Sequence, residues 1–201
     1  MQAVYEIEMV RSIALCQRYC YSAAMKKTSF AGMNCPVAQA LDQIGEWWSL
    51  LILRNAFNGV RTFDQFQKTL GIASNILAGR LQVLVNAGIL ERARDPHDGR
   101  RFEYRLTDKG RALHPVLVGL YQWGEEWVPN EKGRRVELID DNTGEPIAPL
   151  QVTSKDGRKL RPQEVRVEPG PGADQHILVT LAAGRQRRSE TDSAKQPVSD
   201  S

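Results

Sequence analysis

The spacing of apolar residues changes twice between Cys35 and Trp127, and this change limits the folds open to the chain. In the first part the apolar residues recur every three or four positions, as on one face of a helix. From residue 89 to 106 they alternate with polar residues, as in strands. The helical spacing then returns and continues to Trp127. The pattern therefore predicts several helices, a short pair of strands and a final helix.

Two helices are expected before residue 58. Pro36 suits the first turn of a helix, and an apolar stripe follows it as far as Ile44. A second stripe includes Trp48, which is expected to lie in the core, and it ends at the turn signal Asn58-Gly59.

A short helix, a tight turn and a longer helix are expected next. Thr62, with Gln65 three residues later, has the pattern of a capping box, and Gly71 stands where a left-handed C-terminal cap would lie. Ser74 is expected to be the N-cap of the following helix. That helix has the strongest apolar stripe of the chain, made of Leu77, Leu81, Leu84 and Val85.

The two alternating segments flank Asp98-Gly99, which is typical of a β-hairpin turn. Thr107 then opens the last helix. Helix, helix, short helix, turn, helix, hairpin and helix is the order of a winged helix-turn-helix. The expected fold is therefore mainly α with a β-hairpin wing, of the α+β class.

The remaining segments differ in composition from this domain, which we place at residues 25–129. Residues 1–24 are interpreted as an N-terminal extension, because Met25 is followed by Lys26-Lys27 as at a bacterial start. Residues 130–181 alternate short apolar segments with Gly, Pro, Asp and Asn, which predicts a small antiparallel β module. Residues 182–201 have few apolar side chains and are expected to be disordered.

Composition and charge limit the classes of function. The formal net charge of +3 permits binding to nucleic acid without requiring it. We expect a cytoplasmic protein, because no apolar run is long enough to span a membrane and three cysteines do not form a disulfide framework. The sequence has no catalytic motif and no cofactor-binding glycine loop, and its cysteines and histidines lack the spacing of a metal site. We therefore expect no enzyme, no cofactor and no metal.

The ordered motifs of residues 35–127 resemble the HxlR-type winged-helix regulators of bacteria. The resemblance is carried by Cys35-Pro36, Ala40-Leu41, Ile44-Gly45, Trp48, Arg61-Thr62-Phe63, Ala73-Ser74, Leu77, Arg80-Leu81, Leu84, Gly88-Ile89-Leu90, Glu91-Arg92 and the run from Phe102 to Gly110. It implies a dimeric regulator that binds duplex DNA. The chain departs from the family where Glu46-Trp47 replaces Gly-Lys, and where Ala78-Gly79 lies in the presumed reading helix.

Two groups of residues are predicted to contact DNA. In a helix-turn-helix the second helix enters the major groove, so Ser74, Asn75, Arg80 and Gln82 are expected to face bases or phosphates, with Thr62 at the entry of the first helix. The wing adds Arg92, Arg94, His97, Arg100 and Arg101. The alternatives are that the helix residues form a solvated face and that the wing arginines pair with neighbouring acids.

The last helix and Cys35 suggest two further roles. Val116, Leu120, Trp123 and Trp127 are predicted dimer-interface residues, the tryptophans being interface or core anchors. Cys35 lies at a helix N-terminus, where a thiolate is favoured, so it is either a redox-sensing thiol or a small buried residue. An oxidant or a small molecule is thus an expected effector. The alternative function is an effector- or protein-binding module that uses the winged helix as a dimerisation scaffold.

Overall fold

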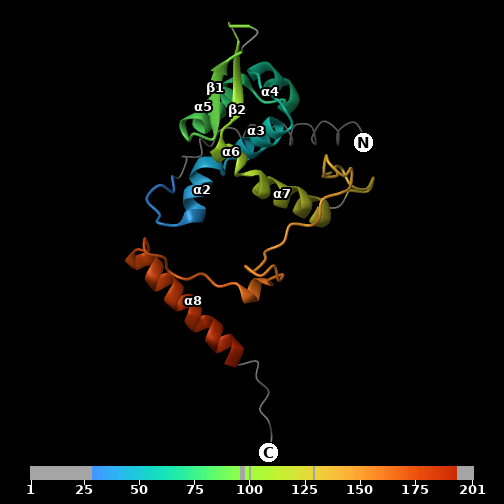
Figure 1. Cartoon of the computed structure of the whole chain (residues 1–201). Coiled ribbons are helices and arrows are strands. Elements are labelled where there is room, and N and C mark those ends of the chain that lie inside the picture. The colour runs from blue at the N-terminus through green and yellow to red at the C-terminus, as the bar shows by residue number, and fades with distance from the viewer. Residues whose placement is uncertain (1–28, 96–97, 100, 129, 194–201) are drawn as a thin grey trace, which may run out of the picture.

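The computed structural model describes residues 29–95, 98–99, 101–128 and 130–193, and within them the chain is mainly helical with one hairpin (Figure 1). The elements are α2 (Pro36–Ile44), α3 (Trp47–Phe57), α4 (Phe63–Leu70), α5 (Ser74–Asn86), β1 (Leu90–Arg94), β2 (Phe102–Leu106), α6 (Asp108–Arg111), α7 (His114–Trp127), the 3-10 helix η1 (Pro162–Glu164) and α8 (Gln175–Ser193). The predicted winged helix-turn-helix order is confirmed. The predicted extension at residues 1–24 lies outside the described residues.

The helix-turn-helix forms as its sequence predicts, with one shift. The Thr62 hydroxyl accepts a hydrogen bond from the Gln65 backbone N–H at 3.4 Å, and the Gln65 side chain accepts from the Thr62 N–H at 3.0 Å, so the capping box is confirmed. Gly71 has a φ of 62°, the left-handed conformation expected of a C-terminal cap. The N-cap of α5 is Ala73 rather than Ser74, which is the first helical residue and does not cap.

The hairpin is confirmed and is joined to the helix-turn-helix. β1 and β2 pair antiparallel with Leu90 opposite Leu106 and Arg94 opposite Phe102. The segment before α4 extends this pairing, since the Tyr104 N–H donates to the Arg61 carbonyl at 2.7 Å and Thr62 forms a bridge with Glu103. The hairpin projects beyond the helices, with α4 and α5 at its base (Figure 1).

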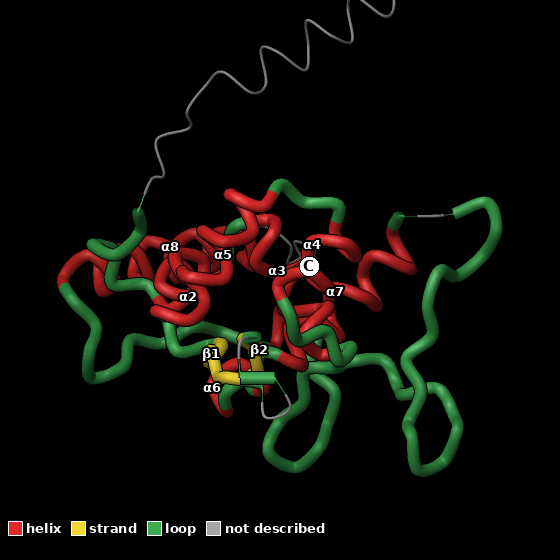
Figure 2. The backbone as a smooth tube through the Cα atoms, turned by 90° about the horizontal axis from the view of Figure 1, so that it is seen from above, coloured by secondary structure: helices red, strands yellow, loops and turns green. Residues whose placement is uncertain are grey.

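The core lies where α3, α4, α5 and the base of the hairpin meet (Figure 2). Its most buried large side chains include Ile52, Phe66, Leu77 and Leu84. Trp48, which was predicted to be core, is partly buried and packs against this cluster. The face of α5 that carries Leu77, Leu81 and Leu84 is therefore fixed inward, and its opposite face is left to solvent.

The predicted last helix is divided into α6 and α7. Thr107 caps α6 through a hydrogen bond from the Gly110 N–H at 3.1 Å, as its position suggested. Pro115 then enters α7 within its first turn. Proline has no N–H and its ring clashes with the carbonyl four residues earlier, so it starts a helix more readily than it continues one.

The predicted β module at residues 130–181 is wrong. This segment contains only two isolated bridges, Ile139 with Pro146 and Thr153 with Lys159, together with η1 and the beginning of α8. Each bridge closes its own turn, and Pro149 just before the run at residues 150–152 and Pro169 just after the run at residues 165–167 lack the N–H that a ladder needs. The sequence of residues 130–181 does alternate short apolar segments with turn residues, but these segments do not pair with one another as strands.

The described part of the predicted disordered tail, residues 182–193, continues α8, while residues 194–201 lie outside the described part of the chain. Its alanines, arginines and glutamines are strong helix formers. The low hydrophobicity of these residues makes packing against a core unfavourable, but it does not prevent them from forming a helix.

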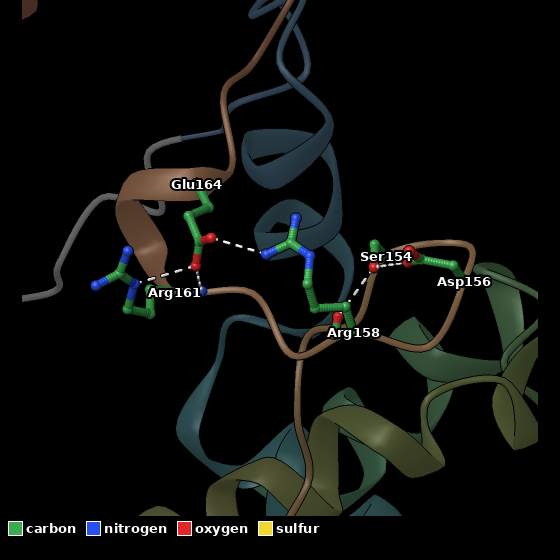
Figure 3. A network of polar contacts seen from close by, with 5 residues as sticks. All are labelled: Ser154, Asp156, Arg158, Arg161 and Glu164. Carbon is green, nitrogen blue, oxygen red and sulfur yellow. Dashed lines mark hydrogen bonds and ion pairs between the residues drawn. The ribbon is translucent and has the colours of Figure 1, made fainter.

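A polar network organises the segment between the second bridge and η1 (Figure 3). The Glu164 carboxylate accepts from the Arg161 N–H at 2.9 Å, the Arg161 Nε at 3.1 Å and the Arg158 guanidinium at 2.8 Å. Nearby, the Ser154 hydroxyl donates to the Asp156 carboxylate. The bonds from Arg161, first from its backbone and then from its side chain, and the bond from Arg158 lower the pKa of Glu164. The hydroxyl of Ser154 is the main cause that lowers the pKa of Asp156.

The lowered pKa of Glu164 gives a direct test of this network. Because the carboxylate is favoured in the folded chain, the network stabilises the segment above the ordinary carboxyl pKa, and the contribution is lost as the pH falls through the lowered value. NMR titration of the Glu164 side chain should give a pKa below that of an ordinary glutamate, and Arg158→Ala should raise it. A pKa unchanged by that substitution would contradict the bond from Arg158 to Glu164.

Two glycines are expected to respond oppositely to alanine. A Cβ at Gly110 would lie 2.2 Å from the Ile89 carbonyl oxygen, whereas a Cβ at Gly79, inside α5, would meet nothing within 4 Å. Gly110→Ala should therefore destabilise the fold by about 1–3 kcal/mol through overpacking. Gly79→Ala should stabilise it by about 0.5–1 kcal/mol. Urea unfolding of the two variants measures both, and equal shifts would refute the argument.

Candidate nucleic-acid interface

The outward side of α5 is polar but uncharged. Ser74, Asn75, Ala78, Gly79 and Gln82, which we call the reading face, are all exposed. Asn75, Gly79 and Gln82 fall on one side of the helix by their spacing of four and three. The Gln82 side chain donates to the Asn86 Oδ1 at 2.7 Å, so these two amides are oriented together. Three of the four predicted α5 contacts thus share one accessible surface.

Arg80, the fourth predicted contact on α5, is engaged with the protein. Its guanidinium lies 3.1 Å from the Glu46 carboxylate, and its side chain is only 24% exposed. Glu46 is the N-cap residue of α3, so the ion pair connects the start of α3 to the middle of α5. The sequence had shown Glu46 only as a departure from the family, and its pairing with Arg80 was not predicted.

Two of the predicted hairpin arginines lie on one face of the hairpin. Because side chains alternate across a strand, Arg92 and Arg94 share the face that also carries Phe102 and Tyr104. The Arg92 guanidinium carbon lies 3.7 Å from the centroid of the Phe102 ring, a cation–π contact that sequence reasoning missed. The alternation of residues 102–106 places Phe102 on the same face as Arg92, and this could have indicated the contact.

The tip of the hairpin is only partly described. Arg101 is exposed, and its Nε lies 3.3 Å from the Asp98 carboxylate. The pairing of wing arginines with neighbouring acids, which the sequence left open, is therefore found at this position. His97 and Arg100, also predicted to contact DNA, lie outside the described residues.

A hollow of about 290 Å³ separates the hairpin from the start of α4. It is lined by Thr62, Phe63, Asp64, Arg92, Arg101, Phe102 and Tyr104. The structure therefore brings Thr62 next to two of the predicted wing arginines. Its charge is mixed, since Asp64 faces the same space.

The predicted dimer residues form one stripe. Val116, Leu120, Trp123 and Trp127 are all exposed, the two tryptophans by 60% and 66%. Their spacing of four, three and four places them on one side of α7. The tryptophans are therefore not part of the core of the described chain, which leaves an unpartnered apolar surface.

Cys35 is the N-cap residue of α2 and is partly exposed. It is the single cysteine among residues 29–95, 98–99, 101–128 and 130–193. The thiol lies at the end of α2 rather than beneath it, because the helix begins at the next residue, so the alternative of a small buried residue gains no support from its position.

The described residues hold neither a metal site nor a membrane-spanning helix. They contain no group of three or more histidine, cysteine or acidic side chains arranged to hold a metal ion. Among the same residues, no helix combines the length and the apolar character needed to cross a membrane.

Comparison with known proteins identifies similar chains. The model of the HxlR-like helix-turn-helix family matches residues 43–132. An HTH-type transcriptional regulator of Mycobacterium bovis, Mb3122, is 42% identical over 136 residues, which are 68% of this chain and 86% of that protein.

Solved structures agree with this match. Transcription factor PA1607 has a TM-score of 0.68 and 45% identity, covering 71% of this chain and 100% of its own. Transcription factor PA1374 from Pseudomonas aeruginosa has a TM-score of 0.50 and 36% identity, covering 76% and 99% respectively. The segment matched by the family model contains α3 to α7, and hence both the reading face and the hairpin.

Proposed function

Because this chain belongs to the HxlR-like helix-turn-helix family of transcriptional regulators, which are not enzymes, we propose that it is a dimeric repressor that binds specific sites on double-stranded DNA. The observation that carries the proposal is the exposed, uncharged reading face of α5 beside a hairpin on which Arg92 and Arg94 share one face. A face of this kind suits base edges, and the hairpin suits the phosphate backbone. It would act in the cytoplasm, where bacterial DNA lies.

In this proposal α5 enters the major groove. Asn75 can pair with adenine through both polar atoms of its amide. Gln82 offers a second amide about two turns further along the same side of the helix. No side chain caps the first turn of α5. Its free backbone N–H groups, next to Ser74, are therefore available to a phosphate.

The hairpin supplies the positive charge. Arg94 is exposed, and Arg92 is held over Phe102, which orients its guanidinium while leaving the side chain exposed. Arg101 would exchange Asp98 for a phosphate at little cost, because an exposed ion pair contributes at most about 1 kcal/mol. Thr62 lies beside Arg92 and Arg101 and would complete a backbone contact. His97 and Arg100 belong to the same proposed surface.

Arg80 has a different proposed role from the wing arginines. To touch DNA it would have to leave Glu46, so we expect it to orient α5 against α3 first and to contribute to DNA affinity less than Arg94 does. This assignment follows from the partial burial of the pair, which strengthens it relative to a fully exposed one.

The dimer is part of the proposal. One winged helix covers one half-site, whereas two related by a two-fold axis can present reading helices about 34 Å apart, one turn of DNA. The exposed stripe of Val116, Leu120, Trp123 and Trp127 is the proposed contact between the two copies.

A second candidate function is effector or protein binding with the winged helix as a scaffold. A pocket of about 390 Å³ supports it, between α7 and the segment that follows. Its lining combines Tyr121, Glu125 and Glu126 with Val136 and Ile147, a mixture suited to a small polar molecule with an apolar part. Such a pocket is also compatible with a DNA-binding regulator that responds to an effector.

Binding to duplex DNA across a salt series tests the main proposal. Fluorescence anisotropy with DNA from the gene's own upstream region should show affinity about a hundredfold above that for an unrelated duplex. Arg94→Ala and Arg101→Ala should each reduce the salt dependence by about one unit, because each removes one phosphate contact. Arg134→Ala, an exposed arginine outside the proposed interface, is the matched control.

The outcomes separate the two candidates. Equal, weak binding to both duplexes that is unaffected by the arginine substitutions would favour the scaffold function. Loss of affinity in Arg134→Ala as large as in Arg94→Ala would show a nonspecific charge effect and refute the proposed interface.

We also propose that oxidation of Cys35 regulates DNA binding. The thiol lies at the N-terminus of α2 and is partly exposed, a position that admits an oxidant. Treatment with a thiol oxidant should weaken DNA binding at least about tenfold in the natural chain, with recovery on reduction. Cys35→Ser should be unaffected by the oxidant. If that variant responds equally, the proposed switch does not involve Cys35.

A further inference from the structure

The C-terminal arm, residues 130–193, has no core of its own. Among residues 130–188 none is buried, although the segment has a defined path with turns, two bridges and two helices. Large apolar side chains are exposed along it, Leu150 by 54% and Val152 by 62%. Figure 1 shows the arm leaving the helices of the winged-helix domain and ending in α8.

Polar contacts hold the first part of the arm against α7. The Gln122 side chain accepts from the Leu150 N–H at 2.6 Å and donates to the Ala148 carbonyl at 3.2 Å. The Arg135 guanidinium lies 3.7 Å from the Glu125 carboxylate and donates to the Val128 carbonyl at 2.8 Å. These bonds position the arm without burying its apolar side chains.

The arm continues the apolar stripe of α7. Gly119 lies next to Leu120 of the stripe, and a Cβ there would meet the Leu150 side chain at 3.5 Å. Leu150 therefore lies at the edge of the stripe, and Val152 follows two residues further along. The composite surface consists of Val116, Leu120, Trp123, Trp127, Val128, Leu150 and Val152, all of them exposed.

This surface is large for a monomer. At roughly half exposure and about 150–200 Å² for each large side chain, the seven residues present on the order of 600 Å² of apolar-residue surface, at the upper end for a monomer. Soluble monomers rarely leave more than about 300–600 Å² of contiguous apolar surface exposed, whereas a stable interface buries about 800 Å² on each partner.

We propose that the C-terminal arm is part of the dimer interface and packs its apolar residues against a second copy of this chain. An ordered segment that buries nothing within its own chain must offset its loss of conformational entropy elsewhere. The second copy carries the same stripe and the same arm, so a two-fold contact covers both surfaces at once. This inference rests on the proposed dimer and adds the arm to it.

The match to PA1607 is consistent with an arm that belongs to the fold. It covers 71% of this chain, a larger share than residues 1–129 make up, so the match must include arm residues. At least part of the arm is therefore matched in a solved structure.

Sedimentation equilibrium of the full chain tests the arm directly. Val152→Asp and Leu150→Asp should each raise the dissociation constant of the dimer at least about tenfold, because each places a charge in an apolar contact. Gln151→Asp, between them and exposed, adds the same charge without removing an apolar side chain, and should change it less than about threefold. Circular dichroism should show unchanged thermal unfolding of the monomer for all three.

Each outcome bears on a different claim. If Trp123→Asp dissociates the dimer while both arm variants associate as the natural chain does, the dimer stands and the role of the arm is refuted. Equal weakening by Gln151→Asp also refutes it. A natural chain that is monomeric at every concentration removes the proposed dimer together with this inference, whatever its DNA binding.

Discussion

The pairing of residues 61–62 with β2 is the constraint on which the rest of this structure depends. One short segment supplies the carbonyl that accepts from the Tyr104 N–H and the bridge to Glu103, and it also starts the capping box of α4. The helix-turn-helix and the hairpin therefore share residues rather than merely touching. Because Phe66 then packs beneath Tyr104 with ring centroids 6.5 Å apart, the orientation of α5 relative to the wing is set by both bonding and packing.

Positive charge in this domain is distributed unevenly, and that distribution shapes the proposed mode of DNA binding. Arg80, the cation on the reading helix, is paired with Glu46, so the reading face keeps only amides, a hydroxyl and small residues. Exposed cations are found on the hairpin, where Arg92, Arg94 and Arg101 lie. Base recognition and backbone attraction are then assigned to separate elements, which allows the operator preference to differ from that of relatives while the electrostatic contribution is kept.

The apolar side chains of α7 and the arm are exposed, whereas those of the core are buried. In the core, Leu77, Leu81 and Leu84 are buried within the chain itself, and each side chain has a partner. On α7 and the arm the same kind of side chain is exposed, and polar bonds such as those of Gln122 hold the backbone in place. The proposed two-fold partner would resolve this difference, since it would turn both exposed surfaces into one interface.

The sequence by itself determined the local features of the winged helix: the capping box at Thr62, the left-handed Gly71, the hairpin around Asp98-Gly99 and the inward stripe of α5. Each depends on residues within a few positions of one another, so periodicity and capping rules suffice to predict it. Only the tertiary structure decided the partner of Arg80, the cation–π contact of Arg92 and the path of residues 130–181. Alternating apolar residues show that a segment can be a strand, but whether it becomes one depends on a neighbour with free backbone groups, and within residues 130–181 no such ladder forms.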